Sequence, residues 1–228
     1  MSWVDGAKRR AAEAAARHVK SGTVIGLGTG STAEYLIQII GAYLSAGQLT
    51  DVQGVPTSNQ TAAYAKEAGI PLTTLDDHPE LTLSIDGADL IDGDLNAIKG
   101  GGGALLREKI VASASETYIL IADETKIVEK LGTGFPLPIE VLPFSATPAA
   151  DRVGKLGASV ALRRGKLGPA TTDNGNFILD ADFGPMDDPA GLERELKSIP
   201  GVLETGLFLG YADVAYVGTP DGVRKRKR

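Results

Sequence analysis

One stretch of the chain, residues 84–110, contains a pair of aspartates after a predicted strand, a lysine before a run of four glycines, and a glutamate on the helix expected next. The run LTLSI at 81–85 is typical of a short strand, and the segment DGAD with Asp86 and Asp89 follows it at once. Open α/β sheets bind their ligands beyond the carboxyl ends of the strands, so both carboxylates stand where a site is expected. Carboxylates, a cation and backbone amides together suit a site that holds an anionic, oxygen-rich substrate and moves protons on it.

The lysine precedes the glycine run directly, as Lys99 before Gly100, Gly101, Gly102 and Gly103. Ordering glycine is entropically costly, so such a run is useful where backbone N–H groups must approach a ligand or where φ is positive before a helix. We therefore expect the cation and the amide dipoles of the turn to act on one anionic oxygen of the substrate.

The glutamate, Glu108, lies on the helix that is expected after the glycines. Ala104, Glu108 and Ala112 share one stripe of this helix, because they are spaced at i, i+4 and i+8. A carboxylate among small apolar residues is partly desolvated, which favours a general base. The alternative is a structural ion pair with a cation such as Arg107 or Lys109. The spacing alone leaves these two roles equally open.

A second glycine turn follows the first predicted strand, residues 23–27. The turn is GTGST, from Gly28 to Thr32, and a helix is expected over 33–44. Helix N-terminal amides and the hydroxyls of Ser31 and Thr32 suit a small phosphate group, although Ser31 could also simply cap the helix. The segment completes neither GxGxxG nor GK[ST], so a dinucleotide site and a nucleotide P-loop are not indicated.

Strands and helices alternate over the first 130 residues. The alternation predicts an α/β fold with a mostly parallel, doubly wound sheet. The strand ends at Gly28, Asp86 and Asp123 would then open on one edge, where Lys126 could join the same pocket. Strands are expected at 23–27, 51–55, 81–85 and 118–122, with a further short strand after Gly69, and helices at 5–20, 33–44 and up to residue 68.

Shorter units follow residue 131, and they predict a small α+β domain over 131–206. Residues 213–217 are expected to return to the large sheet, so the large domain comprises 1–130 plus 207–228. Strands are expected at 139–142, 159–162, 177–180 and within 202–208, helices at 149–156 and 189–199, and a tight turn at Asp173 and Asn174.

The chain has 228 residues and a formal net charge of −6. The last five residues are all basic, and the remaining 18 basic and 29 acidic residues give −11, which argues against nucleic-acid binding. The basic end is expected to be a solvated, disordered tail.

The absence of cysteine and the presence of only His18 and His78 argue against a metal site. Without a membrane span or a signal peptide, a cytoplasmic enzyme with no membrane partner is expected.

Seven motifs occur in one order along the chain. They are TGST at 29–32, GVPTS at 54–58, DGAD at 86–89, KGGGGAL at 99–105, LREK at 106–109, TDNGN at 172–176 and GTPDGV at 218–223. Together they resemble the motifs of ribose-5-phosphate isomerases of type A, and the resemblance covers essentially the whole chain. It implies a Rossmann-like α/β domain with a smaller inserted domain, in agreement with the fold that the order of strands and helices predicts.

The resemblance implies interconversion of ribose 5-phosphate and ribulose 5-phosphate in the non-oxidative pentose phosphate pathway, without a metal or other cofactor, by a homodimer or homotetramer. It places the general base at Glu108. Asp86, Asp89 and Lys99 match residues at the sugar oxygens, either aspartate being a candidate to assist ring opening, and Lys8 matches a lysine at the phosphate. The matching binding loops contain Thr29, Gly30, Ser31, Thr32, Gly87, Ala88, Gly100, Gly101, Gly102 and Lys126.

Three other kinds of protein share this kind of fold. A non-catalytic phosphosugar-sensing domain would need the phosphate loop but not Glu108 with Lys99, and would normally be joined to a DNA-binding segment, which the sequence does not indicate. An amino-sugar phosphate deaminase would need a histidine near the site, and both histidines are poorly placed for that role. A CoA transferase would use a thioester-forming glutamate, but the DGAD and KGGGGAL pair argues against it.

Overall fold

The computed structural model describes residues 2–228, which form two compact units. Each unit has its own hydrophobic core. The first contains residues up to Ala88 together with Arg107–Lys126 and Gly210–Arg228, and the second contains Asp89–Leu106 and Ile127–Leu209. The division at 1–130 plus 207–228 against 131–206 stays a prediction.

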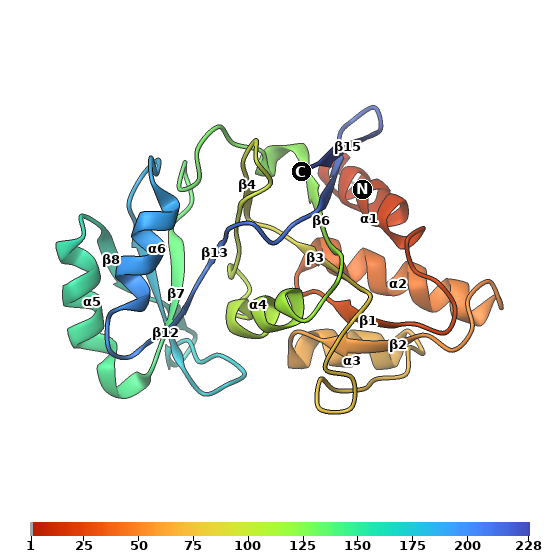
Figure 1. Ribbon diagram of the computed structural model, residues 1–228, viewed down its shortest axis with the longest axis horizontal. Helices are drawn as coiled ribbons and strands as arrows, with labels where there is room; N and C mark the ends of the chain where they lie inside the picture. The colour runs from red at the N-terminus through yellow and green to blue at the C-terminus, as the bar shows by residue number, and fades with distance from the viewer. Residues whose placement is uncertain (1) are drawn as a thin grey trace. The chain divides into compact units, whose positions relative to one another are not determined.

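A six-stranded sheet forms the centre of the first unit, in the order β15-β14-β6-β3-β1-β2 (Figure 1). All neighbouring strands are parallel except β14 and β15, which pair antiparallel. A largely parallel central sheet in a mixed α/β chain confirms the predicted fold class. The strands are β1 (Val24–Leu27), β2 (Gln53–Pro56), β3 (Leu83–Gly87), β6 (Tyr118–Asp123), β14 (Val214–Gly218) and β15 (Val223–Lys227).

Helices α1 (Trp3–Ala16), α2 (Ser31–Ser45) and α3 (Asn59–Glu67) belong to the same unit. Ser2 and Asp5 form a capping box at the start of α1, and a fully buried alanine face packs the helix on α2, β6 and β14. A Cβ on Gly218 would overlap the backbone of Ala7, so glycine there permits the close approach. Helix α1 ends at Ala16, four residues before the end at residue 20 that the sequence predicts.

The basic C-terminal segment is a strand and not the disordered tail that its charge predicted. β15 pairs with β14 along its length, and the turn before it is closed by Thr219 N–H donating to Gly222 O at 2.8 Å. The Nζ of Lys225 lies 5.4 Å from the ring centroid of Tyr216. The prediction from charge is wrong because the turn and the pairing with β14, and not the charges, determine the structure of this segment. Basic side chains on an edge strand also disfavour pairing with another chain.

His18 follows α1 and contacts β14. Its Nε2 lies 2.7 Å from the hydroxyl of Tyr216. Partial burial, and then the charges of Lys225, Lys20 and Lys227, lower the pKa of His18. The neutral imidazole therefore predominates at neutral pH and helps to hold α1 against the sheet.

The second unit has small antiparallel sheets and is of the α+β type (Figure 1). One sheet has the order β12-β7-β11-β8 and another the order β13-β5-β4. Two-residue strands such as β4 and β5 are too short to give a hydrophobic period, so the sequence did not predict them. The strands are β4 (Leu90–Ile91), β5 (Ala97–Ile98), β7 (Leu137–Val141), β8 (Ser159–Leu162), β9 (Arg164–Gly165), β10 (Gly168–Pro169), β11 (Phe177–Asp182), β12 (Val202–Thr205) and β13 (Leu207–Phe208).

The remaining helices connect these strands. Helix α4 (Leu105–Ser113) begins in the second unit and continues into the first, and α5 (Ala146–Lys155) and α6 (Pro189–Lys197) lie in the second. Two short 3₁₀ turns are η1 (Glu124–Lys126) and η2 (Pro143–Ser145). The strand expected after Gly69 is reduced to a single bridge between Gly54 and Leu72. Across residues 2–228, none of the helices is both long and apolar enough to cross a membrane.

Candidate active site

The loop after β1 leads into the N-terminus of α2. Gly30 is the N-cap with a φ of 108°, a left-handed value that favours glycine. Ser31 is therefore the first helical residue and not the cap, which corrects the alternative considered for it. The Nζ of Lys8 donates to Ser31 Oγ at 2.9 Å. A cation thus lies beside a long helix's N-terminus, an arrangement suited to phosphate.

A buried cluster of hydroxyl groups fixes this loop. Thr29 Oγ1 lies 2.7 Å from Thr57 Oγ1, 2.9 Å from Ser58 Oγ and 3.0 Å from Thr61 Oγ1. Thr57 in turn donates to the carbonyl of Leu27 at 3.0 Å. The sequence interpretation did not identify Thr61. The hydroxyl-rich segment TSNQT, directly after β2, is the signal that would have found it.

Asp86 lies near the end of β3 and is only 2% exposed. Its Oδ1 accepts hydrogen bonds from Thr29 N–H at 3.0 Å and from Gly87 N–H at 2.7 Å. A Cβ on Gly28 would overlap the Asp86 carboxylate, so glycine is required beside it. The carboxylate is thereby fixed against the loop after β1, two residues before this segment of the first unit ends at Ala88.

The third predicted strand end in this unit is that of β6. Asp123 is buried and accepts hydrogen bonds from the backbone N–H and the hydroxyl of Thr125, and Lys126 completes the 3₁₀ turn η1. Because β1, β3 and β6 are adjacent and parallel, their carboxyl ends share one edge of the sheet. The sequence prediction that Gly28, Asp86 and Asp123 open on one edge is confirmed.

Glu108 lies in the first turn of α4, directly after the glycine turn. Gly100 and Gly103 have φ values of 103° and 79°, which explains why the chain uses glycine before this helix. The stripe of Ala104, Glu108 and Ala112 is buried, with exposures of 8%, 4% and 4%. The desolvated environment inferred from the spacing is therefore present, and the role of the carboxylate stays a prediction.

Asp89 and Lys99 flank the β4–β5 hairpin in the second unit. Leu90 pairs with Ile98, so the same register places Asp89 opposite Lys99 at the next position. The backbone N–H of Asp89 donates to Ile98 O at 2.9 Å. Lys99 is 2% exposed, and its Nζ lies 5.4 Å from the ring centroid of Phe208. The hairpin thus presents a carboxylate and a buried cation at one end.

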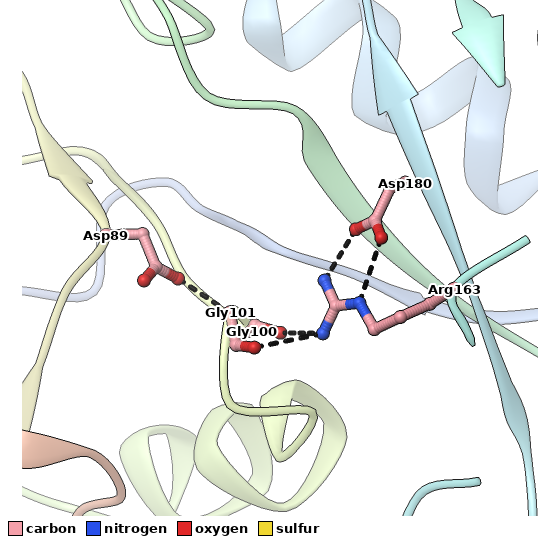
Figure 2. A network of polar contacts seen from close by, with 5 residues as sticks. All are labelled: Asp89, Gly100, Gly101, Arg163 and Asp180. Carbon is pink, nitrogen blue, oxygen red and sulfur yellow. Dashed lines mark hydrogen bonds and ion pairs between the residues drawn. The ribbon is translucent and has the colours of Figure 1, made fainter. Parts of the chain in front are cut away.

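The glycine turn contacts this carboxylate and an arginine. Gly101 N–H donates to Asp89 Oδ2 at 2.7 Å, and Arg163 donates to the carbonyls of Gly100 and Gly101 (Figure 2). Arg163 also pairs with Asp180. The sequence interpretation identified neither member of this pair, because only the register of two short strands brings them to the turn. Within the described residues, no group of three or more histidines, aspartates or glutamates is arranged to hold a metal ion.

Comparison with known proteins gives one consistent result. Residues 53–222 match the family described as ribose 5-phosphate isomerase A (phosphoriboisomerase A). The chain is 48% identical over 216 residues to ribose-5-phosphate isomerase A of Trichodesmium erythraeum, covering 94% of this chain and 91% of the relative. It is 52% identical over 217 residues to the Roseiflexus sp. (strain RS-1) protein of the same description, covering 95% and 93%.

Solved structures agree with the sequence relatives. A D-ribose-5-phosphate isomerase in complex with phospho-erythronic acid has a TM-score of 0.97 and 44% identity, with all of both chains covered. The ribose 5-phosphate isomerase A of Methanocaldococcus jannaschii has a TM-score of 0.94 and 41% identity, covering 98% of this chain and 99% of the other. Both likenesses extend over both units of the chain.

Proposed function

The chain belongs to the ribose 5-phosphate isomerase A family, and we propose that it interconverts D-ribose 5-phosphate and D-ribulose 5-phosphate. It is an aldose–ketose isomerase whose substrate is a phosphorylated pentose, and its place in the pentose phosphate pathway follows from the family. The observation that carries the proposed mechanism is the burial of Glu108, on the small apolar stripe of α4 that directly follows the glycine turn.

Glu108 is assigned as the general base that moves the proton between C2 and C1. In the direction from aldose to ketose, it removes the C2 proton of the open-chain sugar and returns a proton to C1, while the O2 proton passes to O1. The intermediate is an enediolate, whose charge a carboxylate can generate only if that charge is stabilised. Lys99 and the amides of the glycine turn are assigned to stabilise it.

Asp86 and Asp89 are assigned to the hydroxyl groups of the sugar. Either carboxylate can accept the O1 proton of the cyclic sugar and so assist ring opening before the base acts. Hydrogen bonds from Thr29 and Gly87 fix Asp86, and a hydrogen bond from Gly101 fixes Asp89. A solved relative is in complex with phospho-erythronic acid, a phosphorylated acid whose carboxylate carries charge comparable to that of an enediolate.

The N-terminus of α2 is assigned to the phosphate, together with Lys8, Ser31, Thr32 and Lys126. The phosphate does not react, so its binding energy serves to orient the sugar carbons at the base. The contact between Lys8 and Ser31 at 2.9 Å supports this assignment, because it places a cation at the helix N-terminus.

The direct test is an assay of the purified chain with ribose 5-phosphate, with and without excess EDTA. We expect formation of ribulose 5-phosphate at the same rate in both conditions, because each proposed step uses only side chains and amides of the chain. Absence of turnover, with ribose 5-phosphate still raising the melting temperature, would contradict the isomerase and favour the phosphosugar-sensing domain. Activity lost with EDTA and regained with a divalent metal would contradict the metal-free mechanism.

The substitution Lys8→Met tests the phosphate assignment. We expect the KM for ribose 5-phosphate to rise about tenfold to a hundredfold, the effect of losing one hydrogen bond between charged groups, with a smaller change in kcat. Lys66→Met is the matched control, because Lys66 is an exposed lysine on α3. Steady-state kinetics of both variants provide the measurement. An unchanged KM in Lys8→Met would remove Lys8 from the phosphate site.

We further propose a homodimer or homotetramer located in the cytoplasm. The family resemblance supports the assembly, and the exposed apolar side chains of Phe144 and Leu167 provide surface that a second copy could cover. A charged sugar phosphate does not cross a bilayer unaided, which supports action in the compartment where the substrate is made.

A further inference from the structure

Arg163 links two strands of the second unit to the glycine turn. Its Nε donates to Asp180 Oδ2 at 2.9 Å and its Nη2 donates to Asp180 Oδ1 at 2.5 Å. Its Nη1 donates to Gly100 O at 2.8 Å and to Gly101 O at 3.1 Å (Figure 2). One guanidinium therefore holds a carboxylate on one side and two successive glycine carbonyls on the other.

The sheet makes this guanidinium rigid. Arg163 directly follows β8, and its backbone N–H donates to Ile178 O on β11 at 2.8 Å. Asp180 lies on β11, where it pairs with Ala161 of β8. The side chains of Arg163 and Asp180 are only 19% and 23% exposed. A bidentate contact fixes both the position and the plane of the guanidinium, which a lysine could not do.

The glycine turn needs such an external support. Four successive glycines have access to many backbone conformations, and ordering them is entropically unfavourable. Within the turn, Gly103 N–H donates to Gly100 O at 2.9 Å, the same oxygen that accepts from Arg163. Without the guanidinium, the Gly100 carbonyl would keep only the hydrogen bond from Gly103 N–H.

One peptide group connects Arg163 to Asp89. The Gly100 carbonyl and the Gly101 N–H belong to the same peptide, and this N–H donates to Asp89 Oδ2 at 2.7 Å. A cation that bonds to the carbonyl oxygen polarises the peptide and strengthens its N–H as a donor. The Gly101 carbonyl and the Gly102 N–H likewise belong to one peptide, so the contact of Arg163 with this carbonyl strengthens the Gly102 N–H as a donor.

We propose that Arg163 is a positioning residue for the reaction, acting through the glycine turn without touching the substrate. Fixed by Asp180, it holds the carbonyls of Gly100 and Gly101, and so directs and strengthens the N–H groups that face Asp89 and the enediolate oxygen. This inference rests on the proposed isomerase function, because it assigns the purpose of a contact to that reaction. A structural role alone would affect folding but would leave the rate of the folded enzyme unchanged.

The substitution Arg163→Met removes every side-chain donor and keeps much of the side-chain length. We expect kcat to fall about 10- to 100-fold, the effect of a donor displaced by about 1 Å, with KM changed less than about threefold. Arg164→Met is the matched control, because Arg164 is the next residue, of the same type, and exposed on β9. Its kcat is expected to equal that of the unchanged chain.

Chemical rescue separates positioning from folding. In Arg163→Ala, guanidinium or methylguanidinium at millimolar concentration is expected to restore part of kcat, whereas sodium chloride at the same concentration is not. Arg163→Lys is expected to remain impaired, because one ammonium group cannot hold both the carboxylate and the two carbonyls. Circular dichroism confirms that each variant is folded before its rate is measured.

Asp180→Asn provides a second measurement that leaves Arg163 in place. We expect kcat to fall several-fold, because the guanidinium loses one of its two carboxylate acceptors. An unchanged kcat in folded Arg163→Met or in Asp180→Asn would overturn the positioning role, as would a loss of activity that guanidinium ions do not reverse. If the unchanged chain were inactive in the same assay, the proposed function would fail and this inference with it. Full activity in the unchanged chain and in Arg163→Met would overturn only this inference.

Discussion

Glu108→Gln is expected to lower kcat by about 10³-fold and to leave the KM for ribose 5-phosphate nearly unchanged, because the amide cannot accept the C2 proton. Glutamine has the shape of glutamate, so the packing of the buried stripe with Ala104 and Ala112 is kept. The loop proposed to bind the phosphate lies between β1 and α2 and is not altered by this substitution. Steady-state kinetics and thermal shift with ribose 5-phosphate provide the measurements.

Proton exchange gives the sharper version of this test. In deuterium oxide, we expect the unchanged chain to introduce deuterium at the reacting carbon of the sugar, and Glu108→Gln to introduce almost none. Glu129→Gln is the matched control, because Glu129 is an exposed glutamate. Turnover close to that of the unchanged chain in Glu108→Gln would exclude Glu108 as the base. A variant that no longer binds ribose 5-phosphate would instead indicate a structural role for the carboxylate.

The parallel sheet could be predicted from the sequence because its strands carry their own signal. Buried β6 appears as the continuous apolar run YILIA, and β3 follows from the short run LTLSI at 81–85, with acidic residues at the carboxyl end of each. The sequence therefore predicts Asp86 at the carboxyl end of its strand, which in the structure continues to Gly87, and Glu108 on its helix. The helical spacing around Glu108 predicted a desolvated carboxylate, and its 4% exposure agrees.

The contacts that depend on strand register could not be predicted in this way. Arg163 and Asp180 are 17 residues apart, and the carbonyl of Gly100 is 63 residues from Arg163. The pairing of β8 with β11 brings Arg163 beside Asp180, and no local pattern in the sequence reveals this pairing or the contact with Gly100. The same reason explains why β15 was expected to be disordered, because no local pattern in a run of basic residues reveals its partner strand.

Lys99→Met is expected to lower kcat about 10²- to 10³-fold, the usual effect of removing one group that stabilises a developing oxyanion. Methionine keeps the apolar stem that packs beside Phe208 and removes the charge. Lys99 is 2% exposed, and a charge in such a place acts more strongly on an enediolate than a solvated one does. Lys155→Met is the matched control, because Lys155 is an exposed lysine at the end of α5 in the same unit.

Lys99→Met can lose activity either through the oxyanion or through the fold, and a double variant separates these causes. If Lys99 and Glu108 act on the same step, Glu108→Gln combined with Lys99→Met is expected to be about as slow as Glu108→Gln alone, because without the base no enediolate remains for the cation to stabilise. Independent contributions would instead multiply, which would mean that Lys99 affects binding or folding. An unchanged kcat in Lys99→Met would leave the glycine-turn amides, held by Arg163, as the stabilising groups assigned to the enediolate.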